Sequence, residues 1–146
     1  MKPLLLDTSI IVDALRKRNE RHLLVAGLLD QGQPFASCPI TITEIYAGMR
    51  PHEEKPTRTF MKSLLFLAIT EEIAEQAGRL KARYARGGRT LSFQDASIAA
   101  VCIAYGCTLV TENVRDFPVP ELQLSPLSKK RVSEPRFLLR PADVIL

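Results

Sequence analysis

The sequence has few of the residues that build several common classes of protein. It contains no tryptophan, only two histidines, and only short apolar runs such as Ile98 to Ala104. A membrane span needs about 20 consecutive apolar residues, so no such span is expected. The N-terminal stretch reaches Asp7 after only three leucines, which is too short for the apolar core of a secretion signal. We therefore expect a cytoplasmic protein that does not associate with a membrane.

Cysteine is scarce, and its spacing excludes two kinds of scaffold. Cys38, Cys102 and Cys107 are odd in number and form no Cys-x-x-Cys pair. A disulfide framework or a zinc site would need paired or ligand-spaced residues. Cys38 lies in a strand-like apolar run and Cys102 on a helix predicted to be buried. We expect all three to be reduced structural thiols.

Several catalytic motifs are also absent. The sequence has neither the glycine-rich phosphate loop nor the dinucleotide-binding glycine motif. Ser9 and Ser92 lack the Gly-x-Ser-x-Gly context of a serine hydrolase. Ser9 also stands where a haloacid-dehalogenase phosphatase needs a second aspartate. These absences argue against nucleotide-fold enzymes, serine hydrolases and that class of phosphatase.

Strands and helices alternate along the 146 residues, with no internal repeat. The length suits one domain over 1–146, with a core over about 3–125 and a basic extension over about 126–146. Residues 51–57 are predicted to be a loop or helix break. Strands are predicted at 3–6, 34–38, 65–69, 107–111 and 122–124, and helices after Thr8 or Ser9, at 20–30, at 41–49, around 60–64, at 70–86 and at 92–105. Alternation of this kind is typical of an α/β fold with a mostly parallel sheet.

The net charge is +4, and the basic residues form two groups. One interpretation is a solvated helix face and a basic tail. The other is a surface that follows the phosphates of a nucleic acid. Charge alone does not separate these interpretations. The first group is Arg79, Lys81, Arg83, Arg86 and Arg89, and the second is Lys129, Lys130, Arg131, Arg136 and Arg140.

Three acidic residues occur where helices or strands meet the carboxyl edge of the predicted sheet. Asp7 follows the first strand, at the edge where open α/β folds bind ligands, although taken alone it could equally be an N-cap or first-turn acid of the next helix. Glu44 and Asp95 each match a capping box, which by itself favours a purely structural role. However, helices packed on a parallel sheet run opposite to its strands, so their N-termini gather at the same edge as Asp7. We therefore expect the three carboxylates to converge.

Asp116 follows the fourth predicted strand and also belongs at this edge, although it and Asn113 could be ordinary turn residues. Converging carboxylates repel one another unless a cation lies between them. Mg²⁺ and Mn²⁺ prefer such oxygen ligands, and a metal held by carboxylates is suited to phosphodiester hydrolysis.

Four segments, in order, resemble the motifs of PIN-domain proteins, most closely the VapC-type toxins and their FitB-like relatives. The match covers roughly residues 3–125. One departure is Glu112, which adds an acid where the family often has a basic or neutral residue. The matching segments are Leu6-Asp7-Thr8-Ser9, Thr43-Glu44-Ile45-Tyr46-Ala47-Gly48, Asp95-Ala96-Ser97-Ile98-Ala99-Ala100 and Thr111-Glu112-Asn113-Val114-Arg115-Asp116-Phe117.

The resemblance implies a three-layer α/β/α sandwich with a short, mostly parallel sheet. It implies endonucleolytic cleavage of RNA that depends on Mg²⁺ or Mn²⁺, a VapB-like antitoxin partner and a homodimer. Its catalytic and metal-binding residues would be Asp7, Glu44, Asp95 and Asp116, and its supporting residues Thr8, Ser9, Thr111 and Asn113.

Basic residues over 79–89 are predicted to contact the RNA backbone. Two alternatives stay open: a DNA-directed nuclease, and a binding module with an inert site that acts through its antitoxin on operator DNA. Aromatic residues are few, so the sequence shows no strong platform for stacking on single-stranded bases.

Overall fold

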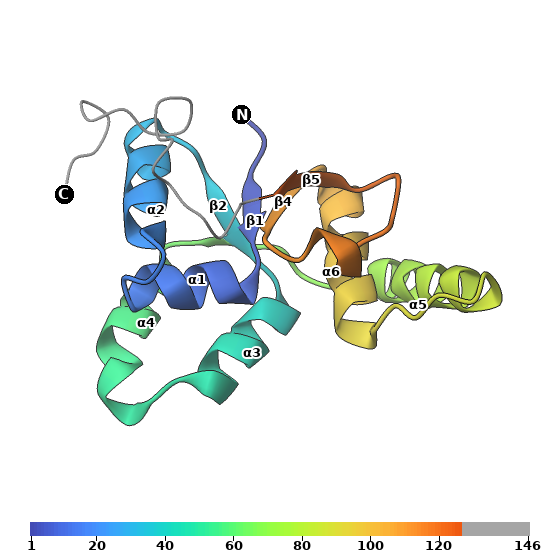
Figure 1. Ribbon diagram of the computed structural model, residues 1–146, viewed down its shortest axis with the longest axis horizontal. Helices are drawn as coiled ribbons and strands as arrows, with labels where there is room; N and C mark the ends of the chain where they lie inside the picture. Colours follow the sequence, from blue (N-terminus) through green and yellow to red (C-terminus); the bar gives the residue numbers. More distant parts are fainter. Residues whose placement is uncertain (127–146) are drawn as a thin grey trace.

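The computed structural model describes residues 1–126, which fold around one parallel five-stranded sheet (Figure 1). The strand order is β3-β2-β1-β4-β5. This topology confirms the predicted α/β fold. The strands are β1 (Leu4–Leu6), β2 (Phe35–Ser37), β3 (Leu65–Phe66), β4 (Thr108–Thr111) and β5 (Gln123–Pro126).

Six α-helices cover the two faces of the sheet in the described part of the chain, with α5 and α6 on one side and α1 to α4 on the other (Figure 1). The connections also contain two short 3-10 helices, η1 (Pro51–Glu53) and η2 (Val114–Asp116). The α-helices are α1 (Thr8–Leu15), α2 (Arg21–Asp30), α3 (Pro39–Gly48), α4 (Glu54–Lys62), α5 (Glu71–Arg86) and α6 (Phe93–Tyr105).

The central strands β1 and β4 divide the core into two halves. Successive side chains of a strand point to opposite faces of its sheet. Leu5 and its neighbour Leu109 pack in the half that includes α5 and α6, whereas Leu6 and Val110 pack in the half that includes α1. All four side chains are buried. The result is the three-layer sandwich that the resemblance implied.

All three cysteines are buried, and each is a free thiol. Cys102 lies on α6, whose middle is almost wholly inside the core. Gly106 ends this helix in the left-handed conformation (φ 71°), and the backbone N–H of Cys107 donates to the Cys102 carbonyl. Glycine suits this position because it has no Cβ to clash there.

Three helix starts differ from the sequence predictions. Asp7 caps α1, as its structural alternative allowed, and Thr8 and Ser9 do not. Helix α3 begins at Pro39 rather than at Thr41, because proline lacks only an N–H that the first turn of a helix leaves unpaired. For the same reason Pro56 is accommodated in the first turn of α4, so the loop predicted over 51–57 is instead η1 followed by helix.

Two further findings bear on the predicted organisation. Among residues 1–126, no helix is both long and apolar enough to cross a membrane. The second basic group, from Lys129 to Arg140, lies outside the described residues, as does nearly all of the predicted basic extension.

Candidate active site at the carboxyl edge of the sheet

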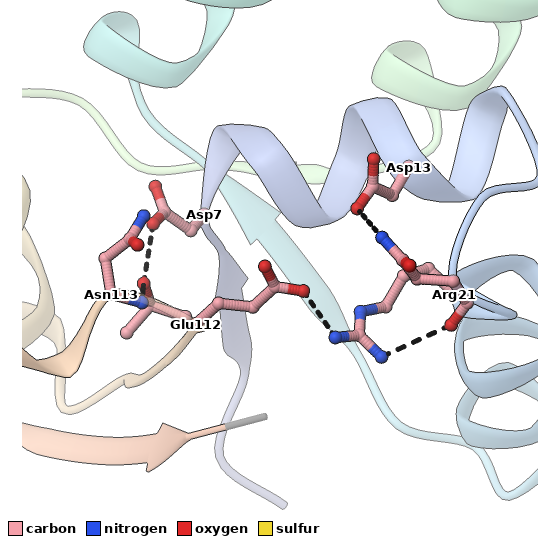
Figure 2. A network of polar contacts seen from close by, with 7 residues as sticks. Asp7, Asp13, Arg21, Glu112 and Asn113 are labelled. Atoms are coloured by element: carbon pink, nitrogen blue, oxygen red, sulfur yellow. Dashed lines mark hydrogen bonds and ion pairs between the residues drawn. The ribbon is translucent and has the colours of Figure 1, made fainter. Parts of the chain in front are cut away.

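Asp7 lies between the ends of the two central strands. Its backbone N–H donates to the Val110 carbonyl at 2.9 Å. One carboxylate oxygen accepts the Thr8 N–H at 2.9 Å. The other accepts the Thr111 hydroxyl at 2.6 Å, the dashed line at Asp7 in Figure 2. The Asp7 side chain is therefore held by both the α1 N-terminus and the end of β4.

Glu44 reaches the same region from inside α3, not from its N-terminus. The capping-box interpretation of Thr41 to Glu44 was wrong, because Cys38 precedes the helix and Thr41 is already a buried helical residue. The Glu44 carboxylate accepts the Thr8 hydroxyl at 2.6 Å. Thr8 therefore links two predicted site residues, since its N–H binds Asp7 and its hydroxyl binds Glu44.

Asp95 lies in the first turn of α6, where its N–H donates to the Ser92 hydroxyl at 3.0 Å. Partial burial raises the pKa of the Asp95 carboxyl, and a hydrogen bond of the Ser92 side chain to that carboxyl opposes this shift. The negative charges of Asp116, Asp7 and Glu44 raise the Asp95 pKa further. The other three predicted acids thus lie within electrostatic reach of Asp95.

Asp116 and Asn113 lie in the turn that follows β4. Asp116 ends η2, and its backbone N–H donates to the Asn113 carbonyl at 3.0 Å. The N–H of Asn113 donates to the Thr111 hydroxyl oxygen at 2.9 Å. The buried Thr111 hydroxyl thus donates one hydrogen bond, to Asp7, and accepts another, from the turn.

The structure also brings to this region a residue that the sequence interpretation missed. Arg21, the first residue of α2, forms an ion pair with Glu112 that is almost completely buried, with the side chains 1% and 8% exposed (Figure 2). Arg21 is one of several basic residues in a charged stretch, and no local signal marks it as the buried one. Its guanidinium compensates the acid that Glu112 adds beside the site.

The oxygen donors and negative charge at this edge suit a hard divalent cation, but a complete coordination shell is not formed. Within residues 1–126, no three His, Cys, Asp or Glu side chains are arranged to hold a metal ion together. Asp7 and Glu44 are instead bound to threonine hydroxyls. The Ser9 hydroxyl, in the first turn of α1, is buried and has no hydrogen-bond partner in the described chain. This unpaired hydroxyl, and the repulsion that three carboxylates exert on Asp95, fit a site that receives a cation.

The predicted basic group occupies the C-terminal half of α5 and the following loop. Lys81 donates to the Leu91 carbonyl at 2.7 Å and lies 4.8 Å from the Phe93 ring centroid, which ties the end of α5 to the start of α6. Phe93 itself is 72% exposed. Two of the arginines are engaged by acids, Arg79 by Glu75 and Arg83 by Glu121, whereas Arg86 and Arg89 are exposed.

This sheet order, with acidic residues after β1 and β4 and on α3 and α6, defines a class of protein. The PIN-domain family model matches residues 4–119, so the chain belongs to the PIN-domain family. Ribonuclease VapC19 of Mycobacterium tuberculosis is 37% identical over 120 residues, which cover 82% of this chain and 96% of that protein. Ribonuclease VapC10 of the same organism is 32% identical over 124 residues, covering 84% of this chain and 91% of the relative.

Solved structures agree with this placement. A toxin–antitoxin complex from Klebsiella pneumoniae contains a chain with a TM-score of 0.68 and 27% identity, and the match covers 86% of this chain and 98% of that one. VapBC2 from Rickettsia felis, bound to a DNA fragment from its promoter, gives a TM-score of 0.74 at 23% identity, with the same coverages. At that identity the second likeness shows the fold alone.

Proposed function

We propose that this protein is a metal-dependent endoribonuclease and the toxin of a toxin–antitoxin module. The observation that carries the proposal is the gathering of Asp7, Glu44, Asp95 and Asp116 at one edge of the sheet, close enough for three of the charges to act on Asp95. The relatives named as VapC ribonucleases support RNA as the substrate.

The four carboxylates would hold Mg²⁺ or Mn²⁺, with Asp7 and Asp95 as the main ligands and Glu44 and Asp116 completing the acidic pocket. When bound, such a cation orients a phosphate, activates water and stabilises the leaving oxygen. Thr111 and Thr8 fix the rotamers of Asp7 and Glu44 through hydrogen bonds of 2.6 Å. The unpaired Ser9 hydroxyl supplies a polar contact for a water molecule or a phosphate oxygen, and Asn113 maintains the turn that carries Asp116.

The proposal extends to the partners and the location of the protein. A VapB-like antitoxin would block the acidic edge, and the toxin would form a homodimer in the cytoplasm. The toxin–antitoxin complexes among the structural neighbours support the antitoxin partner. Arg79, Lys81, Arg83, Arg86 and Arg89 would contact the RNA backbone, since Lys81 joins α5 to the helix that bears Asp95.

A binding module with an inert site is the second candidate. The observation in its favour is that, over residues 1–126, the acidic side chains form no ready ligand set. Such a module would act through its antitoxin on operator DNA. The two candidates differ in whether the purified protein binds Mn²⁺ and cuts RNA.

The test is cleavage of a panel of structured RNAs and one single-stranded DNA by antitoxin-free protein, with Mg²⁺, with Mn²⁺ and with excess EDTA. Asp7→Asn is the site variant, because asparagine also caps helices well and should preserve the fold. Asp30→Asn, at the exposed end of α2, is the matched control. We expect metal-dependent RNA cleavage that Asp7→Asn removes and Asp30→Asn retains. Absence of both RNA cleavage and calorimetric Mn²⁺ binding would favour the inert module, and cleavage confined to DNA would identify the other alternative.

A further inference from the structure

The most enclosed charged contact in the described chain is the Arg21–Glu112 ion pair beside the acidic edge. We propose that this pair is a positioning device: it holds the turn after β4 so that the Thr111 hydroxyl stays on the Asp7 carboxylate. The proposal rests on the nuclease function proposed above, because it assigns Arg21 and Glu112 to the support of the same site.

The first argument is the place of Glu112 in the chain. It lies between Thr111, whose hydroxyl donates to Asp7, and Asn113, whose N–H donates to that same hydroxyl oxygen. Rotation of the backbone at residue 112 would displace the Asn113 N–H from the Thr111 hydroxyl oxygen, and this contact helps to orient the hydroxyl whose proton Asp7 accepts. An anchor on the Glu112 side chain consequently fixes the orientation of Asp7.

The second argument is how the chain presents Arg21. In the loop between α1 and α2, Lys17, Asn19 and Glu20 all have left-handed backbones, with φ of 56°, 52° and 56°. Residues other than glycine seldom adopt this conformation, and each instance persists only where its surroundings enforce it. An unusual loop conformation is thus maintained directly before the buried arginine.

Asp13 on α1 holds this loop in place. The Asp13 carboxylate accepts the Asn19 side-chain amide at 2.9 Å, and its carbonyl accepts the Arg18 N–H at 2.7 Å. Arg21 in turn donates to the Asn19 carbonyl at 3.4 Å (Figure 2). Hydrogen bonds from both sides therefore hold this loop: one set involves Asp13 of α1, and the other comes from Arg21, which directly follows the loop.

These contacts close into a ring. Asp7 caps α1, α1 carries Asp13, and Asp13 fixes the loop that delivers Arg21 to Glu112. Glu112 is followed by Asn113, whose N–H donates to the Thr111 hydroxyl oxygen. The Thr111 hydroxyl in turn donates to the Asp7 carboxylate, which completes the ring. A buried ion pair is weak evidence for stability, since well-packed apolar residues often replace one without loss. The role that we propose for this pair is therefore to position a carboxylate, not to add stability.

The experiment removes both charges while keeping the packing, with Arg21→Met combined with Glu112→Leu. The matched control is Arg16→Met with Glu53→Leu, which removes another ion pair (2.7 Å) at the opposite end of α1. Four measurements are made on each variant: urea unfolding for the midpoint, hydrogen exchange for the Asn113 and Thr8 amides, calorimetry for the Mn²⁺ affinity, and RNA cleavage kinetics for kcat and KM.

For the Arg21/Glu112 double variant we expect a folded protein in which the Asn113 and Thr8 amides exchange at least about tenfold faster. Loss of groups that orient metal ligands typically lowers metal affinity or activity by about 10–100-fold, so Mn²⁺ affinity or kcat should fall in that range, with KM little changed. The Arg16/Glu53 control should leave all these site readouts at the wild-type level.

A folded double variant with wild-type exchange at both amides and wild-type Mn²⁺ affinity would overturn the proposal. If the double variant does not fold, Arg21→Lys serves instead, because it keeps the charge and loses the planar fork of the guanidinium. Faster Asn113 exchange at unchanged global stability would then support positioning, and unchanged exchange would refute it. The exchange measurement needs neither metal nor RNA, so it separates failure of this proposal from failure of the nuclease function.

Discussion

Arg21 and Arg83 each bind a glutamate carboxylate, but the two ion pairs lie in very different surroundings. The Arg21–Glu112 pair is almost fully buried next to Asp7, whereas the side chains of Arg83 and Glu121 are 47% and 50% exposed. Buried side chains have no water to replace their partner, so the fold fixes the geometry of their ion pair. Exposed partners are screened by solvent and salt and can be released to another ligand.

The difference suggests that the two regions serve the proposed reaction in different ways. At the carboxyl edge, hydroxyls and a buried arginine hold carboxylates in fixed places. On α5, basic side chains lie on an open surface, and two of the arginines there form ion pairs with surface acids. These acids would compete with RNA phosphates for the arginines. The first arrangement suits metal coordination, and the second suits loose contact with a phosphate backbone. Three predictions test this contrast.

The largest effect is expected from Asp95→Asn. Because loss of an outer-shell partner already costs about 10–100-fold, loss of a predicted ligand should lower RNA cleavage by more than about 100-fold. Stability without metal should change in the opposite direction. The pKa of Asp95 is higher in the folded state than its unfolded value near 3.8. Ionisation of this carboxyl therefore favours the unfolded state. The free energy of unfolding falls as the pH rises from the unfolded pKa through the raised, folded pKa.

The measurement is urea unfolding of wild type and Asp95→Asn, with EDTA present, at about pH 3 and about pH 7. We expect the asparagine variant to be the more stable at pH 7 and the gap to close at pH 3, where wild-type Asp95 is protonated. Asp30→Asn is again the control. A variant that cleaves RNA normally, or that is no more stable at pH 7, would remove Asp95 from the acidic cluster.

The second effect concerns stability and compares the two ion pairs directly. Arg21→Ala leaves the carboxylate of Glu112 buried without its partner, a change that typically costs about 3–5 kcal/mol. Arg83→Ala breaks an exposed pair, for which about 0–1 kcal/mol is usual. Chemical unfolding of both variants at neutral pH gives the two free energies. Equal losses would contradict the contrast between a fixed and a releasable pair.

The sequence predicted the four acids and the sheet that brings them together, because each depends on a local pattern. Asp7 follows a buried strand, and Ser92 with Asp95 forms a recognisable helix start that the structure retains. Glu44 was predicted to reach the site for a partly wrong reason, since Pro39 moves the helix start and leaves Glu44 inside α3. In the sequence alone, a proline that starts a helix cannot be told from one that interrupts a strand or a helix.

The Arg21–Glu112 pair could not be predicted in this way. Its partners are 91 residues apart in the chain. Their contact depends on three left-handed residues before α2, and Lys17, Asn19 and Glu20 carry no glycine signal for that conformation. Local patterns therefore identify residues that face the site but not the contacts that fix their positions.

The smallest effect is expected from the basic surface, measured as the salt dependence of RNA binding. In the described part of the chain, Arg86 and Arg89 form no ion pair, whereas Arg79 and Arg83 bind Glu75 and Glu121. Each phosphate contact contributes about 0.7 to the slope of log affinity against log salt concentration for a single strand. Arg86→Ala with Arg89→Ala should therefore reduce this slope by up to about 1.4, two contacts at that value.

Arg79→Ala with Arg83→Ala should reduce the slope less, because binding RNA through these side chains also requires breaking their ion pairs. The measurement is fluorescence anisotropy of a labelled single-stranded RNA in the Asp7→Asn background, which prevents cleavage during the titration. Equal slopes for the two double variants would mean that the surface acids do not compete with RNA. A wild-type slope in both would place the RNA path away from α5 altogether.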